Sequence, residues 1–536
     1  MPVVPSLATL AGMTETSTEP HHDTAASAAN AADFLRLTPG LQHRFATELP
    51  ALCQRWQPAR APQPVLLVLN HPLAHALGWP ADALDSAHGE ALLSGNAIPP
   101  TWPAVAQVYA GHQFGGYSPQ LGDGRALLLG EVLDAQGVLR DVAFKGSGRT
   151  PFSRGGDGKA ALGPMLREYL ISEAMHALGV PTTRSLAVVA TGERIRRDSG
   201  WLPAAVLTRV AASHIRVGTF QWVAAQRNPA LLRRLADHTL ARHYPALPAA
   251  DYRGLLQAVC ERQAQLVAQW MALGFVHGVM NTDNMTLSGE TIDYGPCAFM
   301  EAFDPATVFS SIDHAGRYAW GRQAAIAQWN LARLAEALLP LIHPDADQAV
   351  ALATDTVQGF SDLYQQAWLA QMRAKLGWVA PPQTTATHDP QAEADLALLN
   401  DWLALLHAQR ADWTLAHRHL TQLARQDPAG QQLLQGWADA RGLNDWLLRW
   451  QARLNQQPAA QAQALLTMQR SNPLYIPRNQ RVEEALNAAS DDGDLQPFLA
   501  LLSVVQQPFD EVPGWQRYTQ PADAAQAQTY RTFCGT

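Results

Sequence analysis

The chain is poor in lysine and in long apolar stretches, and its net charge is negative. It holds three lysines, Lys145, Lys159 and Lys375, against 36 arginines, so arginine serves wherever a general cation is needed. A position that keeps lysine is therefore expected to need a compact ammonium rather than a planar guanidinium fork. No run of about 18 apolar residues occurs, so no membrane-spanning helix is predicted. The formal charge of −8 argues against a general nucleic-acid binder.

Cysteine is also scarce. The four thiols, Cys53, Cys260, Cys297 and Cys534, form no Cys-x-x-Cys motif and are too sparse for a disulfide scaffold. They are either reduced thiols without a role, or Cys534 in the tail reaches Cys297 and forms a redox latch. Residues 1–33 contain no Lys or Arg, so neither a signal peptide nor an Arg-rich transit peptide is predicted, and we expect a disordered segment there.

The first half of the chain contains alternating strand and helix patterns. Hydrophobic residues make up 47% of the sequence and charged residues 16%, as in a globular protein. Apolar runs between turn-forming residues predict strands at 126–132, 141–145, 186–190 and 204–210. Between the second and third strands, apolar residues at helical spacing predict a helix that begins at Pro164 and ends at Gly179.

Most of the second half is predicted to be helical. Helical patterns cover residues 225–275, resume after residue 320 and fill 380–470, whereas 505–536 is irregular. The fold class is therefore α+β, and the order strand–strand–helix–strand–strand resembles the small lobe of a protein kinase. We expect a two-lobe fold, with the following segments: disordered residues 1–33, a small lobe at 34–200, a large lobe at 201–380 and a mainly helical C-terminal region at 381–536.

The most informative stretch is 277–284 (HGVMNTDN), followed by 291–296 (TIDYGP). Two apolar segments around a Ser-Gly turn predict a β-hairpin, with Asp283 and Asn284 at its entrance and Asp293 at its exit. Carboxylate and amide oxygens are the ligands that a Mg²⁺-nucleotide site needs. We therefore expect Asn284 and Asp293 to hold a metal and Asp283 to orient or deprotonate a hydroxyl. The alternative is that all three are turn formers.

Protein kinases use a catalytic-loop Asn and the Asp of Asp-Phe-Gly in the same order. Here Asp-Tyr-Gly takes the place of that motif and the usual His-Arg-Asp is missing, which predicts a kinase relative with altered chemistry. A kinase-like site also needs a strand lysine held by a helix carboxylate. Lys145 ends a predicted strand, and Glu168 is the leading partner, ahead of Glu173. Arg209 and Arg216 could clamp phosphates, or they could be surface arginines.

Two Gly-rich stretches supply the rest of the expected phosphate site. Gly122 and Gly124, next to Arg125, would let backbone N–H groups approach phosphates, although an ordinary hairpin turn is the alternative. The loop that joins Lys145 to Lys159 is too cationic for a plain linker and suits phosphate neutralisation. Asp157 and Gly158 would shape the far end of the pocket, unless the loop is simply a flexible surface segment.

These motifs resemble one family in particular. The stretches that carry the resemblance are 108–125 (VYAGHQFGGYSPQLGDGR), 145–154 (KGSGRTPFSR), 181–186 (PTTRSL), 278–285 (GVMNTDNM), 293–296 (DYGP) and 472–479 (NPLYIPRN). They are similar to the SelO (selenoprotein O, YdiU-like) family over nearly all of the chain after residue 35. The resemblance implies a pseudokinase that binds ATP in a flipped orientation. It would transfer AMP, rather than phosphate, to Ser, Thr or Tyr hydroxyls of protein substrates.

Carried over residue by residue, the resemblance implies specific roles. Asp283 would be the proton acceptor, Asn284 and Asp293 would hold Mg²⁺ or Mn²⁺, and Glu168 would pair with Lys145. Family members can carry selenocysteine near the C-terminus, where this chain has Cys534. The expected ATP contacts are Gly122, Gly124, Arg125, Lys145, Asp157, Gly158, Arg209, Arg216 and Asp293.

The sequence leaves competing functions open. A divergent kinase would transfer the γ-phosphoryl group, a variant enzyme would transfer UMP from UTP with Mn²⁺, and a scaffold would bind nucleotide without catalysis. We expect a monomer in the bacterial cytoplasm that binds nucleotide and protein but neither nucleic acid nor membrane.

Overall fold

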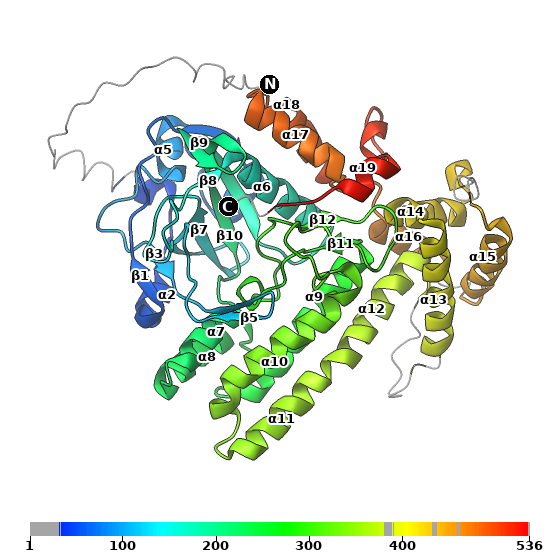
Figure 1. The fold of residues 1–536 in the computed structure, drawn as a ribbon, viewed down its shortest axis with the longest axis horizontal. Helices are drawn as coiled ribbons and strands as arrows, with labels where there is room; N and C mark the ends of the chain where they lie inside the picture. The colour runs from blue at the N-terminus through cyan, green and yellow to red at the C-terminus, as the bar shows by residue number, and fades with distance from the viewer. Residues whose placement is uncertain are drawn as a thin grey trace.

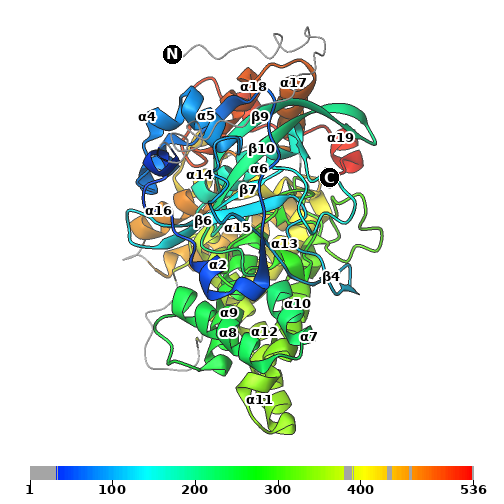
Figure 2. The same ribbon diagram turned by 90° about the vertical axis from the view of Figure 1, so that its left-hand side faces the viewer.

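The structure, a computed structural model, describes residues 32, 34–379, 389, 391–430, 437–457 and 461–533. One large antiparallel sheet lies beside a group of long helices, and the C-terminal helices pack around both (Figures 1 and 2). The α+β class is thus confirmed. The expected disordered segment at 1–33 falls almost wholly outside the described residues.

The main sheet has eight strands in the order β1-β3-β6-β7-β10-β9-β2, with β8 paired to β10. Every pairing in it is antiparallel. The sheet extends past the expected lobe boundary at residue 200, because β10 lies between β7 and β9. The strands are β1 (Cys53–Arg55), β2 (Val65–Leu69), β3 (Val105–Gln107), β6 (Ala126–Leu133), β7 (Leu139–Lys145), β8 (Ala160–Ala161), β9 (Arg184–Arg197) and β10 (Gly200–Ala211).

Alternation along the central strands divides their side chains between two cores. On β7, Ala143 joins the core that contains α6, whereas Val142 and Phe144 join a second core on the other face of the sheet. On β10, Leu207 and Val206 divide in the same way. This is the period of two that a sheet buried on both faces requires. Short elements cover the second face: α3 (His71–Ala76), α4 (Ala81–Leu84) and α5 (Ala87–Leu93).

Helix α6 (Leu162–Ala177) packs against β9 and β10. It begins slightly before the predicted Pro164 and ends at Ala177, slightly before the predicted Gly179. That glycine has φ +80°, and the Val180 N–H donates to the Met175 carbonyl, as in a Schellman C-cap. The outer side of α6 is covered by helices from the C-terminal region, α17 (Asn479–Asp491) and α18 (Gln496–Val505).

The helices below the sheet in Figure 1 are centred on α9, which contacts α10, α11 and α12. These helices confirm the prediction that most of the second half of the chain is helical. None of the helices in the described ranges is long and apolar enough to cross a bilayer. The bounds are α7 (Val217–Ala225), α8 (Pro229–His243), α9 (Tyr252–Ala272), α10 (Gln323–Ile342), α11 (Ala346–Gln358) and α12 (Phe360–Leu376).

Further helices follow in the C-terminal region. Stacked tryptophans hold part of this region together, with the Trp402 and Trp446 ring centroids 4.4 Å apart. The helices are α13 (Ala392–Gln409), α14 (Trp413–Ala424), α15 (Ala440–Asn455), α16 (Gln461–Ser471) and α19 (Ala524–Thr529). Smaller elements are α2 (Arg44–Glu48), the hairpin β4 (Gly111–Gln113) and β5 (Gly116–Ser118), the 3₁₀ turn η3 (Thr282–Asn284), and the pair β11 (Phe275–Val276) and β12 (Ala298–Phe299).

The predicted hairpin around the Ser288-Gly289 turn is wrong. The segment before the turn bridges to Arg216 through Thr286, and the segment after it bridges to Thr182 through Thr291. Each arm therefore forms its backbone bridge with a different part of the chain, and the Thr286 hydroxyl joins the arms by bonding the backbone N–H and carbonyl of Glu290. Local apolar patterning shows that a segment is extended, but it does not show which partner satisfies its backbone.

Candidate active site

A cavity of about 570 Å³ lies where the main sheet, α6 and the segments on either side of η3 meet. It brings together every residue that the sequence predicts for the site. The Gly-rich turn precedes β6, the lysine ends β7, and the two arginines come from β10 and the start of α7. The predicted residues that line it are Gly122, Gly124, Arg125, Lys145, Asp157, Gly158, Glu168, Arg209, Arg216, Asp283, Asn284 and Asp293.

Two cations and two carboxylates form the base of this cavity. The Lys145 ammonium donates to Glu168 Oε2 at 2.5 Å and to Asp293 Oδ1 at 2.7 Å. The Arg209 guanidinium also reaches both acids, with Nε 2.9 Å from Glu168 Oε1 and Nη2 2.6 Å from Asp293 Oδ1. The predicted Lys145–Glu168 pair is thus present. Glu173, the less favoured candidate, instead binds Arg184.

The cations keep both carboxylates ionised. Burial alone would raise the pKa of Asp293, but Lys145, Arg209 and Arg216 outweigh it and hold the pKa well below its usual range. For Glu168, burial likewise opposes ionisation, and Arg209 and Lys145 lower the pKa overall. Removal of either member of such a buried ion pair is destabilising, because it leaves the other charge uncompensated.

Asp283 lies in a different environment within the same cavity. Burial raises the pKa of its carboxyl to about 6, against the lowering effects of a hydrogen bond from Gln113 and the charge of Arg216. Its Oδ2 accepts from Gln113 Nε2 at 3.2 Å, whereas its Oδ1 is buried and has no hydrogen-bond partner. A carboxyl group with a pKa near neutrality can take a proton in a reaction and release it afterwards.

The donor set suits a divalent cation that is shared with a substrate. The Asn284 amide nitrogen donates to the Val279 carbonyl at 3.0 Å, which leaves the amide oxygen available as a ligand. Both hydrogen bonds to Asp293 use Oδ1, which leaves Oδ2 available as a ligand. The described residues contain no cluster of three or more His, Cys, Asp or Glu side chains arranged for a metal. Mg²⁺ bound with a nucleotide typically has only one or two protein ligands, and phosphate oxygens fill further positions around the ion.

The Gly-rich turn and the cationic loop close one side of the cavity. Gly122 has φ +85°, and a Cβ there would come within 2.6 Å of the Phe152 ring, so only glycine fits. In the loop, Asp157 receives a bidentate bond from Arg197, at 2.8 and 3.0 Å. Arg149 donates from Nε and Nη2 to the loop's own carbonyls, of Gly156 and Gly155, and does not line the cavity.

Several residues that were not predicted contact the predicted ones in this cavity. The Arg216 guanidinium lies 4.3 Å from the Tyr109 ring centroid and 3.9 Å from Asp123 Oδ1, and its Nε is buried without a partner. Asp123 stands between the two predicted glycines, so the Gly-Asp-Gly motif contained the signal for it. Tyr109 and Gln113 lie in the 108–125 stretch that carries the resemblance, but the sequence does not show that they face Arg216 and Asp283. Arg197 lies in none of the motifs, because its contact with Asp157 joins distant segments.

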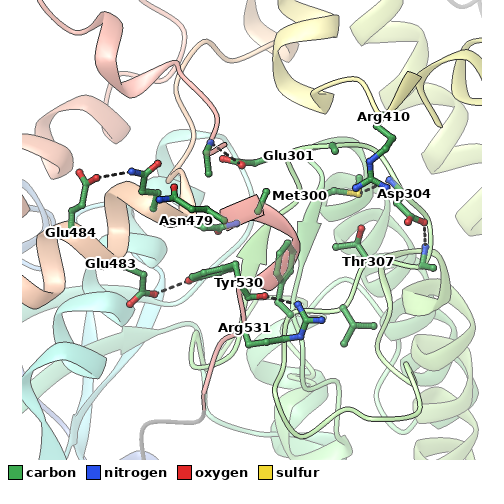
Figure 3. A pocket seen from close by; sticks show the side chains of 18 of the residues that line it. Met300, Glu301, Asp304, Thr307, Arg410, Asn479, Glu483, Glu484, Tyr530 and Arg531 are labelled. Atoms are coloured by element: carbon green, nitrogen blue, oxygen red, sulfur yellow. Dashed lines mark hydrogen bonds between the residues drawn. The ribbon is translucent and has the colours of Figure 1, made fainter. Parts of the chain in front are cut away.

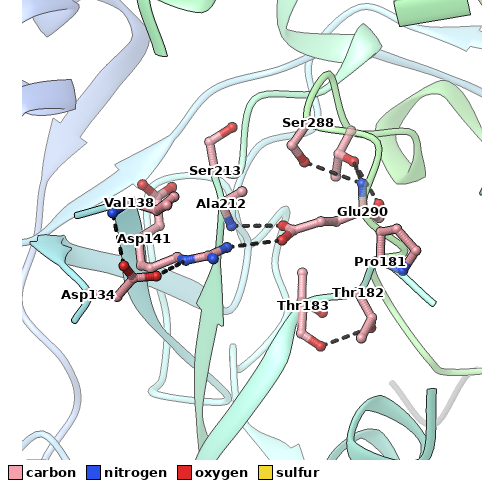
Figure 4. Close-up of polar contacts among 12 residues, drawn as sticks. Asp134, Val138, Asp141, Pro181, Thr182, Thr183, Ala212, Ser213, Ser288 and Glu290 are labelled. Carbon is pink, nitrogen blue, oxygen red and sulfur yellow. Dashed lines mark hydrogen bonds and ion pairs between the residues drawn. The ribbon is translucent and has the colours of Figure 1, made fainter. Parts of the chain in front are cut away.

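A half-buried acid anchors the turn between Asn284 and Asp293. Glu290 Oε2 accepts from the Ala212 N–H at 2.7 Å, and Oε1 lies 3.5 Å from Arg140 Nη1, as Figure 4 shows. Arg140 also binds Asp134 at the end of β6. The turn that separates the proposed metal ligands is thus fixed to the sheet and to the connection that precedes Arg216.

The C-terminal tail contacts the segment that follows Asp293. Tyr530 donates to Glu483 Oε1 at 2.7 Å (Figure 3). This carboxylate also accepts from Arg167. Thr532 Oγ1 donates to the Pro296 carbonyl at 2.6 Å. These residues lie beside a second cavity of about 560 Å³, between residues 300–309, α17 and the tail.

The redox-latch interpretation is not tested by the structure. Cys297, next to Pro296, is buried, and burial raises the pKa of its thiol to about 12. Cys534 lies outside the described residues.

Comparisons with known proteins identify the family of the chain. The family described as "Protein adenylyltransferase SelO" matches residues 37–506. "Protein nucleotidyltransferase YdiU" of Chromobacterium violaceum is 56% identical over 489 residues, which cover 90% of this chain and 100% of the relative. Proteins with the same description from Mycobacterium sp. (strain KMS) and Cereibacter sphaeroides are 56% and 54% identical, over 92% and 93% of this chain and 99% and 100% of theirs.

The site and these matches define the chain as an enzyme of the nucleotidyltransferase class. Within that class, it belongs to the SelO family. The resemblance predicted from the motifs is therefore confirmed, whereas the roles of individual site residues remain predictions.

Proposed function

We propose that this protein transfers AMP from ATP to Ser, Thr or Tyr hydroxyls of other proteins and releases pyrophosphate. The observation that carries the proposal is the meeting of the Lys145–Glu168–Asp293 network with Asp283 in one cavity of a nucleotidyltransferase. We further propose that the sheet with α6 and the helices around α9 act as the two lobes of a kinase-like fold, with the nucleotide between them.

The proposed roles follow from the environments of the side chains. Asp283, whose pKa burial raises to about 6, accepts the proton of the acceptor hydroxyl. Arg216, with a buried and unpartnered Nε, binds a phosphate oxygen of the nucleotide. Lys145 and Arg209 supply the remaining positive charge and hold Asp293 in place. Asn284 and Asp293 hold Mg²⁺ or Mn²⁺, which neutralises the phosphate charge when bound.

The orientation of ATP decides between AMP transfer and phosphoryl transfer. The proposal takes the flipped orientation, with the α-phosphate next to the acceptor, from the family to which the chain belongs. Incubation of the enzyme with Mg²⁺, a bacterial protein extract and ATP labelled at either the α- or the γ-phosphate separates the two reactions. We expect protein-bound label from α-labelled ATP only. Label from the γ-position alone would instead identify a kinase, and the same test with α-labelled UTP and Mn²⁺ measures UMP transfer.

Substitution of the acids tests their assignment. We expect Asp283→Ala to lower transfer by about 10²–10⁴-fold, as loss of a general base typically does, with little change in ATP affinity. Asp293→Ala should abolish transfer and also weaken Mg²⁺-dependent binding of ATP, because it removes a metal ligand. Transfer and Mg²⁺-dependent ATP binding are measured for each variant, with thermal unfolding as a check of the fold. A near-normal transfer rate in either variant would contradict the assignment.

We also propose that oxidation controls the enzyme through Cys297 and Cys534. Support comes from Thr532, which places the tail beside Pro296. A Cys534→Ser variant that responds to oxidant as the parent does would refute this.

A further inference from the structure

The hairpin formed by β4 and β5 has no part in the function proposed so far. It lies in the long motif at 108–125 and forms a two-stranded sheet of its own. Figure 2 shows it at the edge of the molecule, on the side of α7 and α10. It packs on η3 and α7 rather than on the main sheet. Tyr117, in the middle of β5 opposite His112, has an exposed fraction of 45%.

The hairpin makes a separate contact with each of three successive residues around η3. The His112 N–H donates to Thr282 Oγ1 at 2.7 Å, and the Phe114 N–H donates to Asn281 Oδ1 at 3.1 Å. Between them, Gln113 Nε2 donates to Asp283 Oδ2 at 3.2 Å. Two backbone donors therefore fix the register of the hairpin on the loop, and the Gln113 side chain is brought to the acid as a result.

The hairpin packs closely against Asp283, and neighbouring side chains support this contact. A Cβ at Gly111 would lie 2.3 Å from Asp283 Oδ1, so the hairpin backbone covers that oxygen. Gln221 supports the arrangement from α7, because its Oε1 accepts from Thr282 and its Nε2 bonds His112 Nδ1 at 2.8 Å. Tyr318 adds a further bond to Asn281 at 2.6 Å.

These contacts make the two oxygens of Asp283 unequal. Oδ1 is buried against the hairpin and has no hydrogen-bond partner. Oδ2 accepts one bond from Gln113 and retains a lone pair, so it is the oxygen that can meet an acceptor hydroxyl. A carboxylate without such a bond would sample other rotamers, and a misplacement of about 1 Å can cost about 10²-fold in rate.

We propose that Gln113 is a positioning residue for the transfer reaction: the β4–β5 hairpin holds it so that its amide turns Oδ2 of Asp283 toward the acceptor hydroxyl. This inference rests on the proposed function, and it adds an acceptor-side wall to a site whose other side binds the nucleotide. In this proposal, an acceptor protein contacts the hairpin beside the hydroxyl that reacts.

Two substitutions at Gln113 and one nearby control test the proposal. Gln113→Leu removes the amide donor, and Gln113→Glu keeps the shape but places a second carboxylate beside Asp283. The control is Gln120→Leu, at an exposed glutamine of the same motif that does not line the cavity. For each variant, transfer of α-labelled AMP to the protein extract is measured at saturating ATP and Mg²⁺, and ATP–Mg²⁺ affinity is measured by calorimetry.

We expect Gln113→Leu to lower the saturated rate by about 10- to 100-fold with ATP affinity within about twofold of the parent. Gln113→Glu should be slower still, because two carboxylates repel each other. A purely structural role would not make the isosteric acid the worse variant. Gln120→Leu should match the parent.

The double variant Asp283→Ala/Gln113→Leu gives the sharpest test. If Gln113 acts only through Asp283, the double variant transfers AMP at the rate of Asp283→Ala alone. A further loss in the double variant would overturn the proposal, as would a parental rate for Gln113→Leu when Asp283→Ala is slow. Failure of the proposed function is distinct, because the parent itself would then transfer no α-label.

Discussion

At the scale of single residues, the site shows how ion pairs offset the cost of burying charged groups. Lys145 and Arg209 share Glu168 and Asp293, so each charge has partners of opposite sign. The sequence indicated part of this, because lysine is scarce and Lys145 ends a strand. It could not indicate that Arg209 binds the same two acids, since that contact depends on β10 lying next to β7.

Lys375 is the contrasting case, a buried lysine that has no acidic partner among the residues that the structure describes. Its exposed fraction is 2%, and Nζ donates to the Ser471 carbonyl at 3.1 Å. Burial lowers its pKa from 10.5 to about 7. Between these two values the unfolded chain holds a proton that the folded chain does not, so the free energy of unfolding rises with pH in this window.

We therefore predict that Lys375→Met flattens the pH dependence of stability. The lysine contributes at most about 1.4 kcal/mol per pH unit between pH 7 and pH 10.5, and the variant lacks this contribution. Denaturant unfolding of both proteins at pH 7, 8 and 9 measures the difference. Equal slopes for the parent and the variant would show that Lys375 is not buried as a neutral amine.

At the scale of elements, the sequence predicted what is set locally. Strands β6 and β7 and helix α6 follow from apolar periodicity bounded by turn residues, and the structure confirms them. The hairpin expected at residues 285–292 was wrong, because each arm pairs with a distant segment. The β4–β5 hairpin was missed for a related reason: its importance comes from contacts with η3, far away in the chain.

The anchoring of the turn between Asn284 and Asp293 leads to a prediction at this scale. Glu290→Leu removes the acceptor of the Ala212 N–H, which should cost about 1–3 kcal/mol of stability and loosen the spacing of the two proposed metal ligands. Glu290→Gln keeps an acceptor oxygen and should retain most of the stability. Thermal unfolding and the Mg²⁺ dependence of transfer measure both effects. Equal Mg²⁺ dependence in parent and Glu290→Leu would show that the turn does not set the metal site.

At the scale of the whole molecule, Arg167 connects the site to the C-terminal region. It lies next to Glu168 on α6 and donates to the Gly295 and Cys297 carbonyls, at 3.0 and 2.6 Å, and to Glu483 on α17. The tail joins the same group through Tyr530 (Figure 3). The sequence predicted a mainly helical C-terminal region with a helical pattern at 380–470, but it could not predict that α17 and α18 cover α6, because periodicity does not identify packing partners.

The account as a whole depends on one claim, that the cavity transfers a nucleotidyl group to a protein hydroxyl. Mass spectrometry of acceptor peptides after reaction with unlabelled ATP and Mg²⁺ tests it most directly, with Asp283→Ala as the control. We predict AMP on Ser, Thr or Tyr side chains with the parent enzyme and a large loss of it with the variant. Phosphate on those side chains, or no modification with a folded parent enzyme that binds ATP, would contradict the claim.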